Sequence, residues 1–168
     1  MVTRMIFDNY GVGKHNCDSH IESMEYVVKF TRYMLGGSNS GGAELQIKEE
    51  EEEEEEEEYY IKSKQDGDWI TFHGSPSSFI IMASDALQLW SNDRIKPCTH
   101  RVVLRGNKVM RYCLLLLTYS KGTLSVPEEL MDEEEHPLRF KPLNHPHYVA
   151  LQFSDRSTRL CLKTFCGL

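Results

Sequence analysis

Apolar positions near the start of the chain predict a helix that leads into a strand. Within residues 2–12 they recur at roughly helical spacing, and the glycines that follow, Gly11 and Gly13, suit a helix stop. Tyr26–Met34 is rich in β-branched and aromatic residues, which favours a strand, and a Gly/Ser/Asn loop follows at 36–42.

From Tyr59 the pattern changes to short strand-like runs separated by turn residues such as Asp66-Gly67. The runs recur at about the 8–12 residue spacing that is typical of an antiparallel sandwich or barrel. The predicted strands are Tyr59–Lys62, Trp69–Phe72, Phe79–Met82, Leu87–Trp90, His100–Leu104 and Val109–Tyr119.

The C-terminal part predicts short helices and an extended wrap. Pro127 followed by Glu128 and Glu129 favours a helix start, and three later prolines suggest extended chain. Tyr148–Phe153 and Arg159–Phe165 could each add a helical turn or two. The fold class expected is mainly β with flanking short helices, in one domain divided into a lead-in (1–34), a low-complexity insert (35–58), core strands (59–120) and a C-terminal wrap (121–168).

The acidity of the chain is local. Residues 49–58 are ten consecutive glutamates, and subtracting them from the net charge of −7 leaves +3. Such a run repels itself and offers no apolar face, so it is expected to be solvated disorder or a frayed helix. No Lys/Arg stripe with interleaved aromatics is present elsewhere, so we expect no nucleic-acid binding.

The apolar runs and the cysteines indicate where in the cell the protein is expected. The first twenty residues contain no signal-peptide stretch, and the longest apolar block, Tyr112–Leu117, is far too short to cross a bilayer. The five cysteines are odd in number and form no CxxC pair. We therefore expect a soluble cytoplasmic protein with free thiols, no membrane partner and no zinc finger.

The segment from Ser75 to Val103, which contains the motifs WSN-R and HRV, resembles the distal iron-ligand region of plant 2-oxoglutarate- and Fe(II)-dependent dioxygenases. A tryptophan strand at Asp66–Ile70 precedes it, as in that family. The resemblance implies the C-terminal part of a double-stranded β-helix (jelly roll) of the isopenicillin N synthase type, incomplete here, with His100 as an iron ligand. Ser84 stands where the family has glycine, which would be costly if that turn needs a positive φ.

The resemblance also implies residues for 2-oxoglutarate. Arg111-Tyr112-Cys113 stands where the family has an Arg-x-Ser motif, whose arginine holds the distal carboxylate through paired charge-assisted hydrogen bonds. Cys113 replaces the serine and is a poorer donor. Tyr33 falls where the family has a tyrosine near the same site.

The two ends of the chain extend the resemblance. Val2–Val12 is similar to the helix that leads into the catalytic core, and the tails Val126–His145 and Leu162–Gly167 are similar to a branch that acts in plant specialised metabolism, including glucosinolate side-chain and alkaloid modification. Such enzymes use Fe(II), dioxygen and 2-oxoglutarate to hydroxylate or desaturate a small molecule, and they release succinate and carbon dioxide. The resemblance thus implies an oxidoreductase with a small-molecule substrate.

The other two iron ligands of the family, a His-x-Asp pair, have no counterpart. They should lie between Tyr33 and Trp69, an interval without histidine. Extending the register from Leu45 would put Glu50 and Glu52 at these positions, but in a homopolymer any register fits. We therefore expect catalysis to be absent or severely impaired, as in a truncated gene copy, a fragment or a wrong gene prediction.

Alternative interpretations remain open. The chain could be a non-catalytic interaction protein that presents its glutamates to basic partners, or it could fail to fold stably. Trp69 and Trp90 are expected in the core rather than stacked on a substrate. His136, His145 and His147 match no zinc-site spacing.

Overall fold

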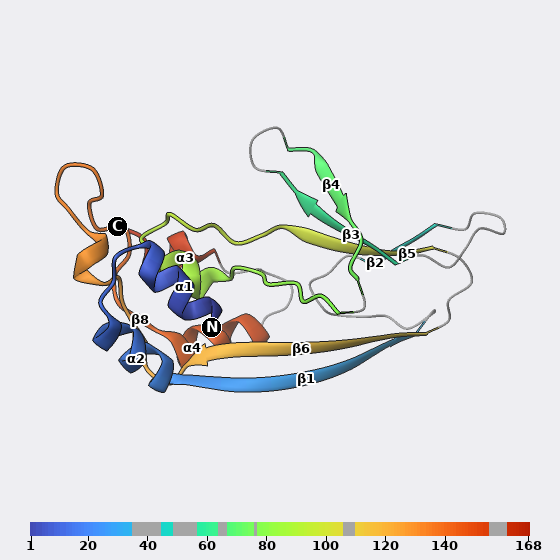
Figure 1. Ribbon diagram of the computed structural model, residues 1–168, viewed down its shortest axis with the longest axis horizontal. Helices are drawn as coiled ribbons and strands as arrows, with labels where there is room; N and C mark the ends of the chain where they lie inside the picture. Colours follow the sequence, from blue (N-terminus) through green and yellow to red (C-terminus); the bar gives the residue numbers. More distant parts are fainter. Residues whose placement is uncertain (35–44, 49–56, 64–66, 76, 106–109, 155–160) are drawn as a thin grey trace. The chain divides into compact units, whose positions relative to one another are not determined.

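A computed structural model describes the chain except for residues 35–44, 49–56, 64–66, 76, 106–109 and 155–160 (Figure 1). The described residues form two compact units that interleave along the sequence. Unit 1 comprises Met1–Val28, Ala83–Pro97 and Leu116–Leu168, and unit 2 comprises Lys29–Met82 and Cys98–Leu115.

Unit 1 contains the helices of the described chain and a short strand pair, β7 with β8. Its first helix ends where the sequence predicts, because Gly11, just beyond the last turn, adopts the left-handed conformation with φ +70° that glycine accepts without strain. Its elements are α1 (Val2–Asn9), α2 (Lys14–Glu22), α3 (Asp85–Trp90), the 3-10 helix η1 (Glu128–Leu130), α4 (His145–Ser154), α5 (Leu162–Cys166), β7 (Thr123–Leu124) and β8 (Leu143–Asn144).

An apolar core holds these distant segments together. Phe7 of α1 stacks on Trp90 of α3 with ring centroids 4.3 Å apart, and both side chains are buried. Burial of such large rings is the dominant stabilising contribution in a small core. The C-terminal segment completes the cluster with Leu130, Phe140, Leu143, Tyr148 and Leu162.

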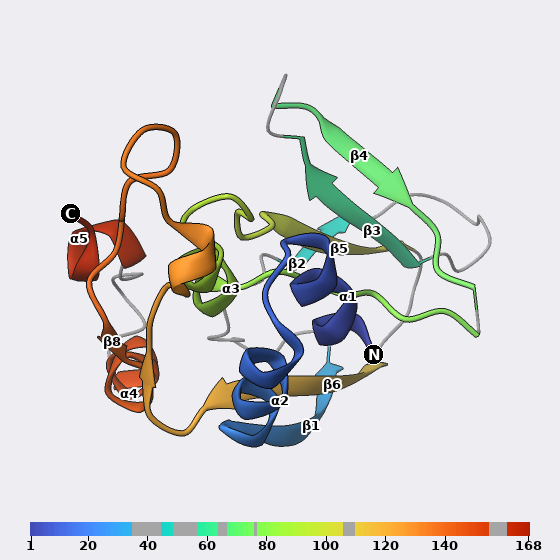
Figure 2. The same ribbon diagram turned by 60° about the vertical axis from the view of Figure 1, so that its left-hand side comes forward.

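Unit 2 is built from strands, and one end of each of β1 and β6 belongs to unit 1. Its larger sheet has the order β2-β5-β3-β4, and β1 pairs with β6 in a separate two-stranded sheet (Figures 1 and 2). Apart from β2, the strands match predicted positions to within one or two residues. They are β1 (Met24–Met34), β2 (Leu45–Lys48), β3 (Glu57–Lys62), β4 (Trp69–Phe72), β5 (His100–Arg105) and β6 (Met110–Ser120).

The strand pairing in the larger sheet is mostly, but not entirely, antiparallel. β3 pairs antiparallel with both β4 and β5, whereas β2 pairs parallel with β5. A jelly roll is built from antiparallel strands, so the β2–β5 pair departs from that pattern. The described chain as a whole is mainly sheet with short flanking helices, as the sequence predicts.

Two predicted strands are wrong. Leu87–Trp90 lies in α3, because Gln88, Leu89 and Trp90 are all buried and strand alternation cannot bury consecutive side chains on one side. Phe79–Met82 has no strand partner among the described residues, and its four side chains are exposed to solvent. Without a neighbouring strand, a β-branched run forms no ladder.

Other expectations were incomplete. The helix α2 was not predicted, and its sequence KHNCDSHIE has few apolar residues to mark it. Trp69 is not a core residue, since it is 36% exposed, whereas Trp90 is buried as predicted. Of the glutamate run, Glu57 and Glu58 begin β3 rather than a frayed helix; the rest of the run and the Gly/Ser loop at 36–42 lie outside the described residues.

No helix in the described part of the chain is long and apolar enough to cross a membrane. All five cysteines are free thiols, as predicted. Ser84 adopts an extended conformation with φ −117°, so the replacement of glycine at this position carries no left-handed strain.

Candidate functional site

His100, the predicted iron ligand, is the first residue of β5 in unit 2. It lies opposite Ile61 of β3, and its side chain is exposed. Nδ1 lies 3.2 Å from the carbonyl oxygen of Cys98. Because a carbonyl can only accept, this contact requires the proton on Nδ1, and it leaves the lone pair on Nε2. A backbone carbonyl that fixes one ring nitrogen in this way is the usual outer support of a metal-binding histidine.

The predicted oxoglutarate residues lie on β6 and β1, which pair with each other. Arg111 and Cys113 are two residues apart on β6, so the two positions belong to the same face of that strand. Cys113 is half-buried. Tyr33 lies near the end of β1, and the side chains of Arg111 and Tyr33 lie outside the described part of the structure.

Glu50 and Glu52 also lie outside the described residues. In the part that is described, no group of three or more His, Cys, Asp or Glu side chains could hold a metal ion. A facial triad for Fe(II) needs two histidines and a carboxylate at one point. The described residues therefore do not complete a facial triad around His100, and they do not fit an iron centre.

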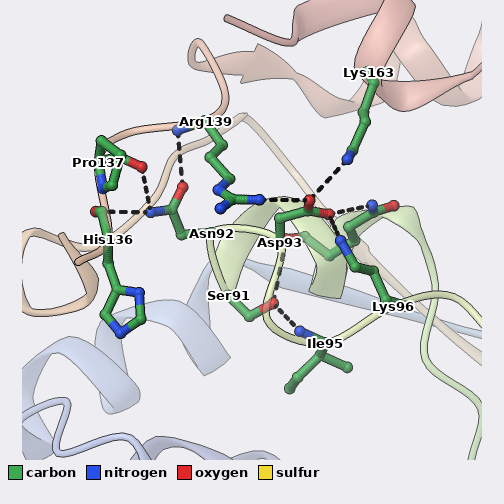
Figure 3. Close-up of polar contacts among 10 residues, drawn as sticks. Ser91, Asn92, Asp93, Ile95, Lys96, His136, Pro137, Arg139 and Lys163 are labelled. Carbon is green, nitrogen blue, oxygen red and sulfur yellow. Dashed lines mark hydrogen bonds and ion pairs between the residues drawn. The ribbon is translucent and has the colours of Figure 1, made fainter.

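The WSN-R segment, which suggested the family, forms a polar cluster in unit 1 (Figure 3). Asn92 and Asp93 have φ values of 52° and 72°, a left-handed conformation that asparagine and aspartate tolerate better than most residues. This turn directs both side chains toward the C-terminal segment. No role was predicted for these two residues from the sequence, although an Asn-Asp pair after a helix is the composition that such a turn favours.

Asn92 binds the backbone of the C-terminal wrap. Its side-chain nitrogen donates to the carbonyl oxygens of His136 at 3.3 Å and Pro137 at 3.1 Å, and its Oδ1 accepts from the backbone N–H of Arg139 at 2.9 Å (Figure 3). One buried side chain thus uses its donors and its acceptor to fix residues more than forty positions away.

Asp93 is a buried carboxylate surrounded by donors. Gln88 donates to it at 2.6 Å, Lys163 lies at 2.8 Å and Arg139 at 3.4 Å, and Lys96 also forms an ion pair with it (Figure 3). Burial would raise the pKa of Asp93, but the hydrogen bonds from Gln88, Lys163 and Lys96 outweigh it and hold that pKa far below the ordinary value. The carboxylate stays ionised and links α3 to α5.

Two further polar contacts fix α4 in unit 1. The hydroxyl of Tyr148 donates to Asp85 at 2.8 Å, and Gln152 donates to the same hydroxyl at 2.8 Å. The backbone N–H of Ser120 donates to Nδ1 of His145 at 3.0 Å, so this histidine is a buried hydrogen-bond acceptor. These contacts stabilise the fold and do not form a reaction site.

Comparison with known proteins agrees with the residues that carry the resemblance. A profile of the 2OG-Fe(II) oxygenase superfamily matches residues 39–118. The 2-oxoglutarate-dependent dioxygenase AOP3 of Arabidopsis thaliana is 34% identical over 112 residues, which cover 64% of this chain and 27% of that protein. The chain therefore spans about a quarter of the length of this curated relative.

Solved structures show the same fold. The dioxygenase for auxin oxidation (DAO) from rice is 27% identical, with a TM-score of 0.58 over 68% of this chain and 40% of that chain. JOX2, crystallised in complex with 2OG, Fe and JA, reaches a TM-score of 0.64 over 89% of this chain and 46% of that chain, at 16% identity. The described strands and helices therefore correspond to part of a jelly roll.

Proposed function

Because the chain belongs to the family of plant 2-oxoglutarate- and Fe(II)-dependent dioxygenases, we propose that it retains part of that family's cofactor machinery but does not by itself assemble a catalytic iron centre. Members of the family act on small molecules, with iron supplying the activation of dioxygen. We propose that hydroxylation or desaturation of a specialised metabolite is the reaction of the longer relatives, and that this chain does not turn it over unaided.

The residues around His100 support this proposal. His100 offers an oriented Nε2, but the described residues form no group of three or more side chains that could hold a metal ion. A single neutral imidazole binds Fe(II) weakly compared with a triad that includes a carboxylate. The interval between Tyr33 and Trp69, where the family has its other ligands, contains carboxylates but no imidazole.

The oxoglutarate half of the site is better preserved. Arg111 stands on β6 with Cys113 on the same strand face, and β1 with Tyr33 is the neighbouring strand. We propose Arg111 as the anchor of the distal carboxylate, since a guanidinium can hold it with two parallel hydrogen bonds. Cys113 weakens this contact, because a thiol is a poor donor where the family has a hydroxyl.

A second function is favoured by the glutamate run. Ten adjacent carboxylates form a dense negative charge on a chain whose remainder carries +3, and such a segment attracts basic partners over about one Debye length. This would be a non-catalytic role, and it requires neither iron nor oxoglutarate.

Anaerobic titration with Fe(II) and 2-oxoglutarate tests the first proposal. Bidentate oxoglutarate on Fe(II) gives a visible charge-transfer absorption, and we expect none from the folded protein. A band that disappears in both His100→Ala and the double variant Glu50→Gln/Glu52→Gln would show that the glutamates complete the site, and it would overturn the proposal.

The oxoglutarate anchor is tested separately by calorimetric titration without metal. We expect weak binding that Arg111→Ala abolishes and that Cys113→Ser strengthens. Arg32→Ala, which removes an exposed arginine of β1, is the matched control and should leave binding unchanged. Equal binding by wild type and Arg111→Ala would remove the anchor from the proposal.

A further inference from the structure

The strand β4 lies at an open edge of the larger sheet in unit 2. The order β2-β5-β3-β4 gives it β3 as its neighbour on one side, and no other described strand pairs with it (Figure 2). Its residues from Trp69 to Thr71 are exposed, and Phe72 is half-buried. An edge of this kind presents backbone donors and acceptors to whatever strand can reach them.

The register shows which backbone groups face outward. Lys62 pairs with Trp69, and one step further the N–H of Ser63 donates to the carbonyl of Asp68 at 2.7 Å. In an antiparallel pair, hydrogen-bonded and non-bonded positions alternate. Trp69 and Thr71 therefore occupy non-bonded positions toward β3, and their N–H and C=O groups point to the open edge.

The neighbouring pair of strands agrees with this assignment. The N–H of Lys62 donates to the carbonyl of Thr99 at 2.9 Å, so Lys62 directs its backbone groups toward β5 and away from its partner Trp69. The outward groups of β4 are thus fixed by two independent hydrogen bonds of the same sheet.

Apart from its short length, β4 has none of the sequence features that usually block strand addition. The strand sequence Trp-Ile-Thr-Phe contains no proline, no lysine and no other charge. Its two faces differ: Trp69 lies on one face, where the guanidinium of Arg101 stacks 4.3 Å from its ring, and Ile70 projects from the other face and is 57% exposed.

We propose that β4 pairs antiparallel with β4 of a second copy of this chain, about a two-fold axis at Ile70. In that register Trp69 lies opposite Thr71 of the second copy and Thr71 opposite its Trp69, so every outward N–H and C=O of both strands finds a partner. A large side chain meets a small one on one face, Ile70 meets its own copy on the other, and no like charges meet.

A second copy fits this edge better than an unrelated peptide because the register is self-complementary. The two outward residues are placed symmetrically about Ile70, and an uncharged strand can lie against itself without repulsion. The interaction continues an existing sheet and is independent of iron or oxoglutarate binding. A strand this short supports a concentration-dependent dimer rather than a permanent one.

Sedimentation velocity over a hundredfold concentration range tests the pairing with charge-swapped variants. The wild type should shift toward the dimer as concentration rises. Ile70→Lys and Ile70→Glu should each remain monomeric, because like charges meet at the axis, and an equimolar mixture of the two should regain the dimer. Phe79→Lys is the matched control, since Phe79 is 93% exposed in the same unit but outside β4, and it should dimerise like the wild type.

Thr71→Pro examines the backbone contact itself. Proline removes only an N–H that points away from β3, so the variant should melt like the wild type by circular dichroism yet lose the dimer. A wild type that stays monomeric at every concentration overturns the proposal, as does a Lys/Glu mixture that fails to recover the dimer. An equal loss of association in Phe79→Lys would assign association to general apolar contact and would also overturn it.

Discussion

At the scale of single residues, the two sequence motifs that identify the family, WSN-R and HRV, have different physical roles. His100 in HRV has its Nδ1 held by the backbone carbonyl of Cys98, whereas Asn92 and Asp93 in WSN-R bind the C-terminal wrap. Family motifs thus mix chemistry with packing, and only the contacts separate them. Sequence alone suggested His100 but gave no sign that Asp93 is buried among three cations.

Replacing Asp93 with asparagine should destabilise the protein. The variant leaves Lys163, Lys96 and Arg139 without their buried counter-charge, at a cost on the order of 2–3 kcal/mol. Urea unfolding followed by circular dichroism measures the loss. Glu134→Gln, which removes an exposed carboxylate, should unfold like the wild type, and an unchanged midpoint for Asp93→Asn would contradict the role assigned to the cluster.

The Asp93 carboxylate also predicts how stability falls in acid. Its pKa in the folded protein is depressed, so its contribution is present above the ordinary carboxylate pKa of about 4 and is lost as pH falls below it. Between pH 4 and pH 2 the wild type should therefore lose more stability than Asp93→Asn. If the free energy of unfolding fell equally with pH in the two proteins, this carboxylate would not be held ionised.

Protonation of His145 should cause a second loss of folding stability, at a milder pH. Burial lowers its pKa, and its Nδ1 already accepts from Ser120, so the folded protein favours the neutral ring. As pH falls below about 6.5 the unfolded chain binds the proton first, and stability should decline by up to about 1.4 kcal/mol per pH unit. His145→Gln, which keeps an acceptor, should show a shallower decline, whereas the exposed His147→Gln should retain the wild-type slope.

At the scale of elements, the periodicity of apolar residues located most strands, but it did not always distinguish a strand from a helix. Tyr59–Lys62 and Trp69–Phe72 were found because β-branched and aromatic runs stood between turns. Leu87–Trp90 was also predicted as a strand but is helical, since burial of three adjacent residues depends on core contacts that no local pattern contains. The helix α2 was not predicted because its sequence is largely polar and gives no apolar periodicity.

One hydroxyl group forms a hydrogen bond between α3 and α4. Tyr148→Phe keeps the ring in the core but removes the hydrogen bond to Asp85 and leaves that carboxylate without this donor. We expect a loss of about 1–2 kcal/mol in the free energy of unfolding, measured by urea titration. Tyr26→Phe, on an exposed ring of β1, is the control; an equal, negligible effect in both variants would mean that the hydroxyl contributes nothing net.

At the scale of the whole molecule, charge and fold are carried by different segments. The described units hold the jelly-roll strands and the helical core, while ten of the acidic residues stand in one run that gives the chain its net charge of −7. The fold family could be recognised from motifs spread along the chain. The fate of the iron site could not be predicted, because its ligands must come together from distant segments. In a run of identical glutamates, no residue can be matched to a particular ligand position.

The acidic run provides the last prediction. If it serves basic partners, the protein should associate with poly-lysine at low ionic strength and release it as salt rises toward 0.5 M, because screening shortens the reach of exposed charges. Replacing residues 49–58 with an equal length of Gly and Ser changes the net charge from −7 to +3 and should abolish the association. Glu133–Glu135 replaced by glutamine, an acidic run elsewhere in the chain, should retain most of it. Fluorescence anisotropy of labelled poly-lysine measures the binding of all three proteins. Equal loss in both variants would contradict a specific role of the ten-residue run.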